Sequence, residues 1–105
     1  MEVLISPGFG AGWSTWAGGK MAAYIRTYKP LIDALKNGED VNREHPVIKN
    51  LCAECEEMFG EPPYLGGLAD LCVRNATPPF QIHDYDGYES IVAPGEDNSW
   101  IMEGE

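Results

Sequence analysis

Residues 45–63 read HPVIKNLCAECEEMFGEPP, and this stretch decides the helical part of the fold. Its apolar side chains recur at intervals of three and four residues, which places them on one face of an amphipathic helix. Pro46 is suited to the first helical turn, and Gly60 followed by Pro62 and Pro63 ends the pattern. The sequence therefore predicts a helix that opens at Pro46 and closes at Gly60. Its expected buried stripe consists of Val47, Ile48, Leu51, Cys52, Cys55, Met58 and Phe59.

The segments on either side of this helix predict a second helix and a small sheet. Pro30 fits the first position of a helix that Lys36-Asn37-Gly38 ends, whereas MAAYIRTY from Met21 allows a turn or two of helix. Asp86-Gly87 marks a hairpin turn. The expected strands are 2–6, 68–75, 80–85 and 88–92. The prediction is an α+β fold with a single domain over residues 1–105, in which an N-terminal strand, a Gly/Trp loop and two helices pack on a small, mostly antiparallel sheet that ends in a three-stranded meander.

The charge of the chain excludes two classes of partner. The formal net charge is −10, every Lys and Arg lies between Lys20 and Arg74, and residues 75–105 carry seven acids and no base. Binding to nucleic acid or to an anionic membrane needs a basic face, so neither is expected. The acids serve either solubility or the attraction of a basic protein. The candidate partner-binding residues are Asp84, Asp86 and Glu89 in the hairpin, and Glu96 and Asp97 in an acidic tail at about 93–105.

The start of the chain and its cysteines predict a cytoplasmic protein. MEVLISPG has only three consecutive apolar residues, which is neither a signal peptide nor a membrane span. The odd number of cysteines, three, predicts reduced thiols. Cys52 and Cys55 have the spacing of a redox pair or half a zinc site, but they fall in mid-helix on the apolar stripe and lack further paired ligands. A structural role is therefore expected for both.

The segment HDYDGYE, residues 83–89, gathers one histidine and three acids without the spacing of a calcium loop. Turn residues are the favoured interpretation, because Asp-Gly is a strong hairpin signal. Acid–base chemistry at His83 is the alternative, if a cleft faces it. The two histidines of the chain fit no Ser–His–Asp or Cys–His arrangement. The sequence therefore assigns no catalytic residue, no metal site and no cofactor.

The segment SPGFGAGWSTW, residues 6–16, contains the most unusual chemistry of the chain. Its glycines match neither a Walker loop nor a Rossmann fingerprint. Closely spaced small residues nonetheless let backbone amides converge on one anion, with hydroxyls and aromatic rings beside it. The candidate ligand-binding residues are Gly8, Phe9, Gly10, Gly12, Trp13, Ser14, Thr15 and Trp16. In the alternative interpretation the indoles fill the core and the glycines relieve crowding, so the direction of the two indoles stays open.

At SPGFGAGWSTW (6–16) and QIHDYDGYESI (81–91), the chain resembles small accessory proteins of bacteriophages and prophages. The resemblance covers most of the chain and carries no residue roles. It implies a short protein that acts in the bacterial host cytoplasm during infection. Such proteins often inhibit host defence, either by binding a defence protein or by sequestering its nucleotide signal.

Three functional hypotheses follow. The first is a non-enzymatic binding protein that inhibits a host protein with a basic surface. The second is a small-molecule binder or sponge that holds a phosphorylated nucleotide in the Gly/Trp loop, where a homo-oligomer would help to enclose the ligand. The third, and least favoured, is a small enzyme. Because the net charge repels phosphates at long range, the sequence favours a protein partner.

Overall fold

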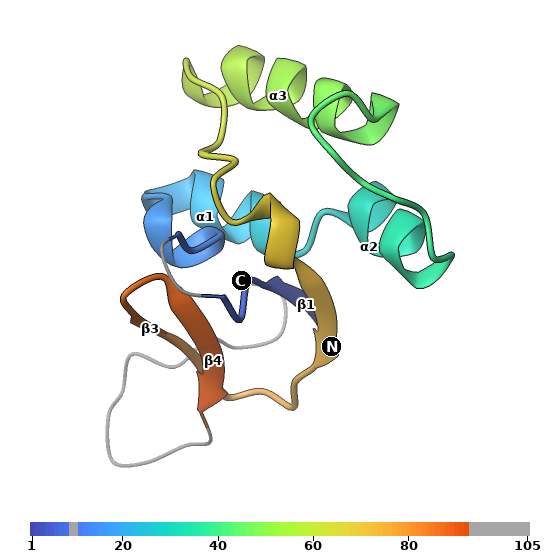
Figure 1. Ribbon diagram of the computed structural model, residues 1–105. Coiled ribbons are helices and arrows are strands. Elements are labelled where there is room, and N and C mark those ends of the chain that lie inside the picture. The colour runs from blue at the N-terminus through green and yellow to red at the C-terminus, as the bar shows by residue number, and fades with distance from the viewer. Residues whose placement is uncertain (9–10, 93–105) are drawn as a thin grey trace.

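A computed structural model describes residues 1–8 and 11–92 of the chain (Figure 1). Phe9, Gly10 and the predicted acidic tail with Glu96 and Asp97 lie outside the described residues. The elements are β1 (Glu2–Ile5), the 3-10 turn η1 (Ser14–Trp16), α1 (Gly19–Arg26), α2 (Lys29–Lys36), α3 (Pro46–Phe59), the 3-10 turn η2 (Leu68–Asp70), β2 (Cys72–Asn75), β3 (Gln81–Tyr85) and β4 (Tyr88–Val92). The predicted α+β class is confirmed.

Helix α3 has the bounds that its sequence predicts. The His45 side chain caps its start by accepting a hydrogen bond from the amide of Val47 at 3.1 Å. Gly60 ends it in the left-handed region at a φ of 85°, where a side chain would be strained. Most of the expected stripe is buried or half-buried, but Met58 is 53% exposed. Met58 therefore lies outside the core, whereas Phe59 beside it packs against the large apolar cluster.

The first helix is longer than its sequence predicts, so residues 1–8 and 11–92 contain three α-helices instead of the expected two. Helix α1 runs for eight residues and buries Met21, Ala22 and Ile25. A helix this short has little stability of its own, so packing of its apolar face decides whether it forms. Helix α2 begins one residue before Pro30 and buries Leu31, Ile32 and Ala34.

The strands form two separate antiparallel pairs, so the expected three-stranded meander is wrong. Strand β2 pairs with β1, with Ile5 opposite Cys72, and β3 pairs with β4 in a hairpin. Residues 68–70 of the expected strand form η2 instead. Pro78 and Pro79 lie between β2 and β3. Because proline cannot donate to a strand ladder, the chain leaves the first sheet at this point.

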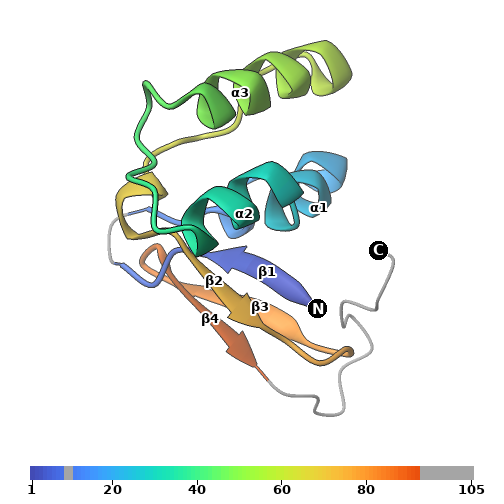
Figure 2. The ribbon, with the colours of Figure 1, turned by 90° about the vertical axis from the view of Figure 1, so that its right-hand side faces the viewer.

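Strand β1 lies between the helices and the hairpin, as Figures 1 and 2 show. Leu4 belongs to the large apolar cluster with the three helices, whereas Val3 and Ile5 belong to a second cluster with Phe80. These three β1 residues are at most 4% exposed. Since successive side chains of a strand point to opposite faces, both faces of β1 are covered, which explains its continuous apolar run.

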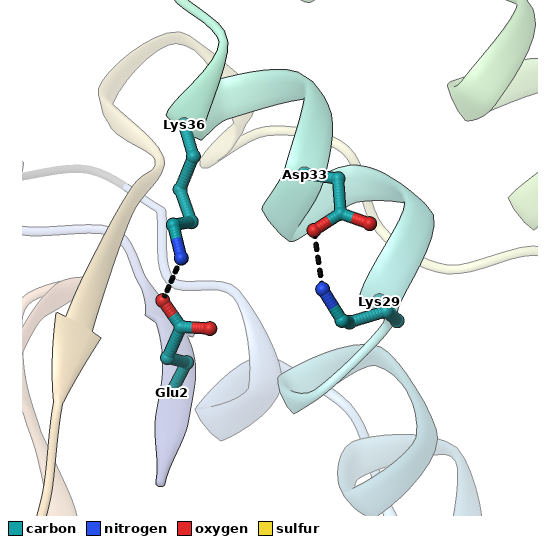
Figure 3. A network of polar contacts seen from close by, with 4 residues as sticks. All are labelled: Glu2, Lys29, Asp33 and Lys36. Atoms are coloured by element: carbon teal, nitrogen blue, oxygen red, sulfur yellow. Dashed lines mark hydrogen bonds and ion pairs between the residues drawn. The ribbon is translucent and has the colours of Figure 1, made fainter.

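Several of the cations lie on the helical side and are paired there. Figure 3 shows Lys36 of α2 reaching Glu2 of β1, with 2.7 Å between Nζ and Oε2, and Lys29 bonded to Asp33 one turn along α2. These pairs are largely exposed, so they add little stability. Their consequence is a local one: they neutralise charge on the helical layer. Among the described residues, no helix has the length and apolar character needed to cross a membrane.

Candidate functional site

The centre of the Gly/Trp loop is occupied by a carboxylate of the protein itself. Glu89 of β4 is 0% exposed. Its Oε1 accepts a hydrogen bond from the amide of Ser6 at 2.8 Å. Its Oε2 accepts bonds from the amides of Trp13 at 2.8 Å and Thr15 at 2.9 Å, and from the Thr15 hydroxyl at 2.5 Å. The amide of Glu89 also donates to the carbonyl oxygen of Ser6 at 3.0 Å. The loop is therefore folded around Glu89.

The hydrogen bonds to Glu89 replace the water that its carboxylate loses on burial. Burial of an ionised group is costly unless hydrogen bonds replace its lost water, and four donors do so for Glu89. The converging amides are the feature that the sequence predicts for a phosphate. In this structure two of them, those of Trp13 and Thr15, are already donated to an internal anion. Glu89 was expected on a partner-binding surface, and its burial excludes it from that surface.

A second charge lies near this buried carboxylate. Burial lowers the pKa of the Arg26 guanidinium, and the charge of Glu89 acts in the opposite direction. The Nε atom of Arg26 is buried and has no hydrogen-bond partner among the described residues. Arg26 thus offsets the charge of Glu89 through space, without an ion pair at contact distance among the described residues.

Gly87 permits the close approach of the loop to the hairpin, and Gly12 permits the close packing of the loop on itself. A Cβ at Gly87, which has a φ of 85°, would lie 2.3 Å from the amide nitrogen of Ala11. A Cβ at Gly12 would lie 2.6 Å from the hydroxyl oxygen of Thr15. Both distances are well below a normal contact, so a larger residue at either position would displace the loop. Gly12 is buried, and its role here is steric.

The two tryptophans of the loop have opposite environments. Trp13 is 0% exposed, and its Nε1 donates to the carbonyl oxygen of Ile25 at 2.9 Å. Trp16 is 42% exposed, and its ring stacks on Tyr64 with 5.5 Å between ring centroids and 15° between planes. The core interpretation therefore holds for Trp13, whereas Trp16 is at the surface. Of the other predicted ligand residues, Ser14 is buried, and Gly8 and Thr15 are half-buried.

Asp84 fixes the exposed tryptophan to the hairpin. Its Oδ2 accepts a hydrogen bond from Trp16 Nε1 at 2.9 Å, and its Oδ1 accepts one from the amide of Gly87 at 2.6 Å. Asp84 is directly opposite Glu89 in the β3–β4 register, so the two carboxylates project from the same face of the hairpin. Asp84 holds the outer part of the loop, and Glu89 holds the inner part.

The alternation of the hairpin residues contains a signal for the burial of Glu89 that our prediction overlooked. Glu89 is two residues before Ile91, and Asp84 is two residues after Ile82. Both isoleucines pack on the cluster beneath β1. Because strand side chains alternate between faces, residues two positions apart point to the same face of the hairpin. Asp84 and Glu89 therefore point to the same face as the two isoleucines, which is the face that the loop covers. No comparable local signal indicates that Tyr64 stacks on Trp16, because that contact joins distant segments.

His83 does not join these acids. It lies on the other face of β3, is exposed, and pairs its Nε2 with Gln81 Oε1 at 2.7 Å. His83, Asp84 and Glu89 therefore do not converge in one cleft, which was the arrangement that would favour acid–base chemistry. Within residues 1–8 and 11–92, no group of three or more His, Cys, Asp or Glu residues could hold a metal ion.

The cysteines are free thiols in apolar surroundings. Burial raises the pKa of Cys55 to about 11, and it also raises the pKa of Cys52 and of Cys72. The thiols are thus protonated at neutral pH, whereas a reactive cysteine needs a lowered pKa. This agrees with the structural role expected for Cys52 and Cys55.

The remaining candidate is a surface formed by the exposed tryptophan and the tip of the hairpin. Tyr64 is 54% exposed and Tyr85 is 78% exposed. Asp84, Tyr85 and Asp86 are consecutive exposed residues where β3 ends. Trp16, Tyr64 and Asp84, which are joined by the ring stacking and the indole hydrogen bond, together with Asp86 in the adjoining turn, are called the aromatic–acidic surface below. It contains two of the predicted partner-binding acids, Asp84 and Asp86.

Comparison with known proteins gives no relative to guide this assignment. No protein-family model matches the chain, and no curated protein or solved structure matches it. The functional argument therefore rests on the residues themselves.

Proposed function

We propose that the protein acts by non-enzymatic binding to a protein with a basic surface, and that the aromatic–acidic surface makes the contact. The observation that carries this proposal is the exposure of Trp16, an indole held in place by Asp84 and Tyr64 but 42% open to solvent. Tryptophan and tyrosine are enriched among the residues that dominate binding energy in protein interfaces.

The fixed orientation of Trp16 supports a binding role. Its Nε1 is already bonded to Asp84, and its ring already rests on Tyr64. A side chain held in one orientation loses little conformational freedom when a partner covers it.

The charge distribution supports a basic partner. The chain has seventeen acidic residues and seven basic ones. Three lysines pair with acids around α2 and α3: Lys29 with Asp33, Lys36 with Glu2 and Lys49 with Glu44. Asp84 and Asp86 bond to no cation in the ion pairs of the described residues. A negative field of this kind speeds encounter with a positive surface and fixes its orientation.

Inhibition would follow from occupation of the basic surface. The expected resemblance to phage and prophage accessory proteins favours a host protein in the bacterial cytoplasm as partner. If that host protein uses its basic surface to hold phosphates, binding of the aromatic–acidic surface would block the site. The nucleotide alternative has weaker support, because the amides of Trp13 and Thr15 are donated to Glu89.

The experiment is a pull-down from bacterial lysate with tagged protein, followed by mass spectrometry. The baits are wild type, Trp16→Ala, Asp86→Asn and the control Glu57→Gln, which removes an exposed acid from α3. We expect one partner with a basic surface to be captured by wild type and Glu57→Gln and lost with Trp16→Ala. Asp86→Asn should weaken capture.

A salt titration completes this test. Raising the salt from about 0.05 M to about 0.5 M shortens the range of charge interactions, so capture should fall. Equal capture by all four baits, or capture that does not change with salt, would contradict the proposal.

A further inference from the structure

A hollow of about 380 Å³ opens beside the stacked pair of Trp16 and Tyr64. Its wall comes from η1, the start of α1 and the segment that follows α3. Besides the two rings, the residues that matter for its chemistry are Met21, Glu61, Pro62 and Pro63. This volume is at the small end of ligand sites, and it accommodates one long side chain rather than a large ligand.

We infer that this hollow anchors an arginine side chain of the partner protein, stacked on the exposed face of one ring of the Trp16–Tyr64 pair. The inference rests on the proposed function, because it assigns one chemical group of the partner to one part of the aromatic–acidic surface.

The rings offer flat, electron-rich surface that is accessible from one side. Their centroids are 5.5 Å apart and their planes differ by 15°, so nothing fits between them. Each ring is nevertheless about half exposed, at 42% for Trp16 and 54% for Tyr64. A cation over the face of an indole or phenol is attracted by the ring quadrupole, and indole attracts it best. The pair therefore presents a platform for a flat cation.

The charges around the platform are negative. Glu61 lines the hollow, and Asp84 accepts the Nε1 hydrogen bond at the edge of the Trp16 ring. None of the residues that line the hollow, all of them described, is a lysine or an arginine. A cationic group in the hollow would thus meet the Glu61 carboxylate and one ring face, with the Asp84 carboxylate bonded at the edge of the Trp16 ring, whereas a phosphate would meet repulsion.

Arginine fits this combination better than lysine does. Its guanidinium is planar and weakly hydrated, so it stacks on a ring while its N–H groups stay free to reach a carboxylate such as Glu61. The ammonium of lysine is compact and strongly hydrated, so it gains less from a half-apolar wall. The apolar parts of Met21, Pro62 and Pro63 suit the methylene stem of an arginine.

The experiment uses three synthetic peptides with the same Gly-Ser background and two arginines, two lysines or two citrullines. Citrulline keeps the shape of arginine and removes its charge. Each peptide is titrated into ¹⁵N-labelled protein, and the indole N–H signals of Trp16 and Trp13 are followed. The arginine peptide should shift the Trp16 signal and leave that of buried Trp13 unchanged. Its affinity should exceed that of the lysine peptide about threefold and that of the citrulline peptide about tenfold.

Variants identify the residues responsible. Tyr64→Ala should abolish the preference for arginine over lysine, because it removes half of the platform. The matched control is Tyr85→Ala, which removes a tyrosine that is 78% exposed, lies on the face of β3 opposite Asp84 and does not line the hollow. It should leave the peptide affinities unchanged. Glu61→Gln should weaken the arginine and lysine peptides alike.

The outcomes separate the anchor from the proposed function. Equal binding of the three peptides, or a Trp16 signal that never moves, would overturn the anchor. If capture of a host protein in the pull-down were still weakened by Asp86→Asn, the proposed function would stand without the arginine contact. If the arginine peptide shifts Trp16 but no partner is captured through the aromatic–acidic surface, the anchor would stand and the proposed function would fail.

Discussion

Two carboxylates face each other across the hairpin and serve different purposes. Glu89 is fully buried and accepts hydrogen bonds from four donors of the N-terminal segment. Asp84, its direct neighbour in the register, is exposed and holds the Trp16 indole from outside. The bonding chemistry is the same in both: a carboxylate accepts N–H groups of the loop. The environment differs: Glu89 is enclosed by the fold, whereas Asp84 lies at the surface that we propose for binding.

The two carboxylates also explain why the Gly/Trp loop offers little space for an external anion. The loop has the converging amides of an anion site, and an anion is bound there in the form of Glu89. What remains accessible is the outer part, with the exposed ring of Trp16. The buried contacts and the proposed binding surface thus lie on opposite sides of a single short segment.

The largest expected effect comes from removing the inner carboxylate. Glu89→Ala leaves two amides of the loop, a third amide and a hydroxyl without their acceptor, all in or near the core. We expect the free energy of unfolding to fall by about 3–5 kcal/mol, as for other broken buried polar networks. Urea denaturation measures the change.

Added acetate provides the internal control for this variant. Sodium acetate at about 0.1 M should raise the Tm of Glu89→Ala and leave that of wild type unchanged relative to sodium chloride, because acetate can enter the vacated nest. A stability loss below about 1 kcal/mol would show that the buried hydrogen bonds do not hold the loop.

The next effect distinguishes the two indoles. Trp13→Phe removes the hydrogen bond to Ile25 and leaves a gap in the core, so we expect a loss of about 2–3 kcal/mol. Trp16→Phe retains a ring at the surface and should cost less than about 1 kcal/mol. Thermal and urea unfolding of the pair measure both values. Equal losses would contradict the assignment of one indole to the core and the other to the surface.

The smallest expected effect on stability comes from the outer carboxylate. Asp84→Ala removes two hydrogen bonds near solvent, so the loss should be about 0.5–1 kcal/mol. Its effect on the surface should be larger, because the Trp16 ring loses its fixed orientation. A broader, shifted Trp16 indole N–H signal in the NMR spectrum would report this freedom. An unchanged signal would mean that Tyr64 alone orients the ring.

Part of the candidate site could be predicted from the sequence. The hairpin and its turn at Asp86-Gly87 follow from local residue types, and the structure places the predicted partner-binding residues Asp84 and Asp86 at the exposed end of this hairpin. The expectation for Glu89 was wrong because it was based on charge alone. Glu89 points to the same face of β4 as Ile91, which is turned toward the interior. The energetic cost of burying its charge is offset by hydrogen-bond donors from the loop.

Local spacing was sufficient to predict α3 and the β3–β4 hairpin, because each depends on residues close together in sequence. The acidic balance of the chain follows from composition alone. Tertiary contacts decided the rest: the pairing of β1 with β2, the length of α1, and the inward and outward directions of Trp13 and Trp16. The hydrogen bonds that Glu89 accepts from backbone amides join residues 74 to 83 positions apart. No local pattern encodes which of two neighbouring indoles will meet such a distant partner, so only the packed chain determines which one remains available for binding.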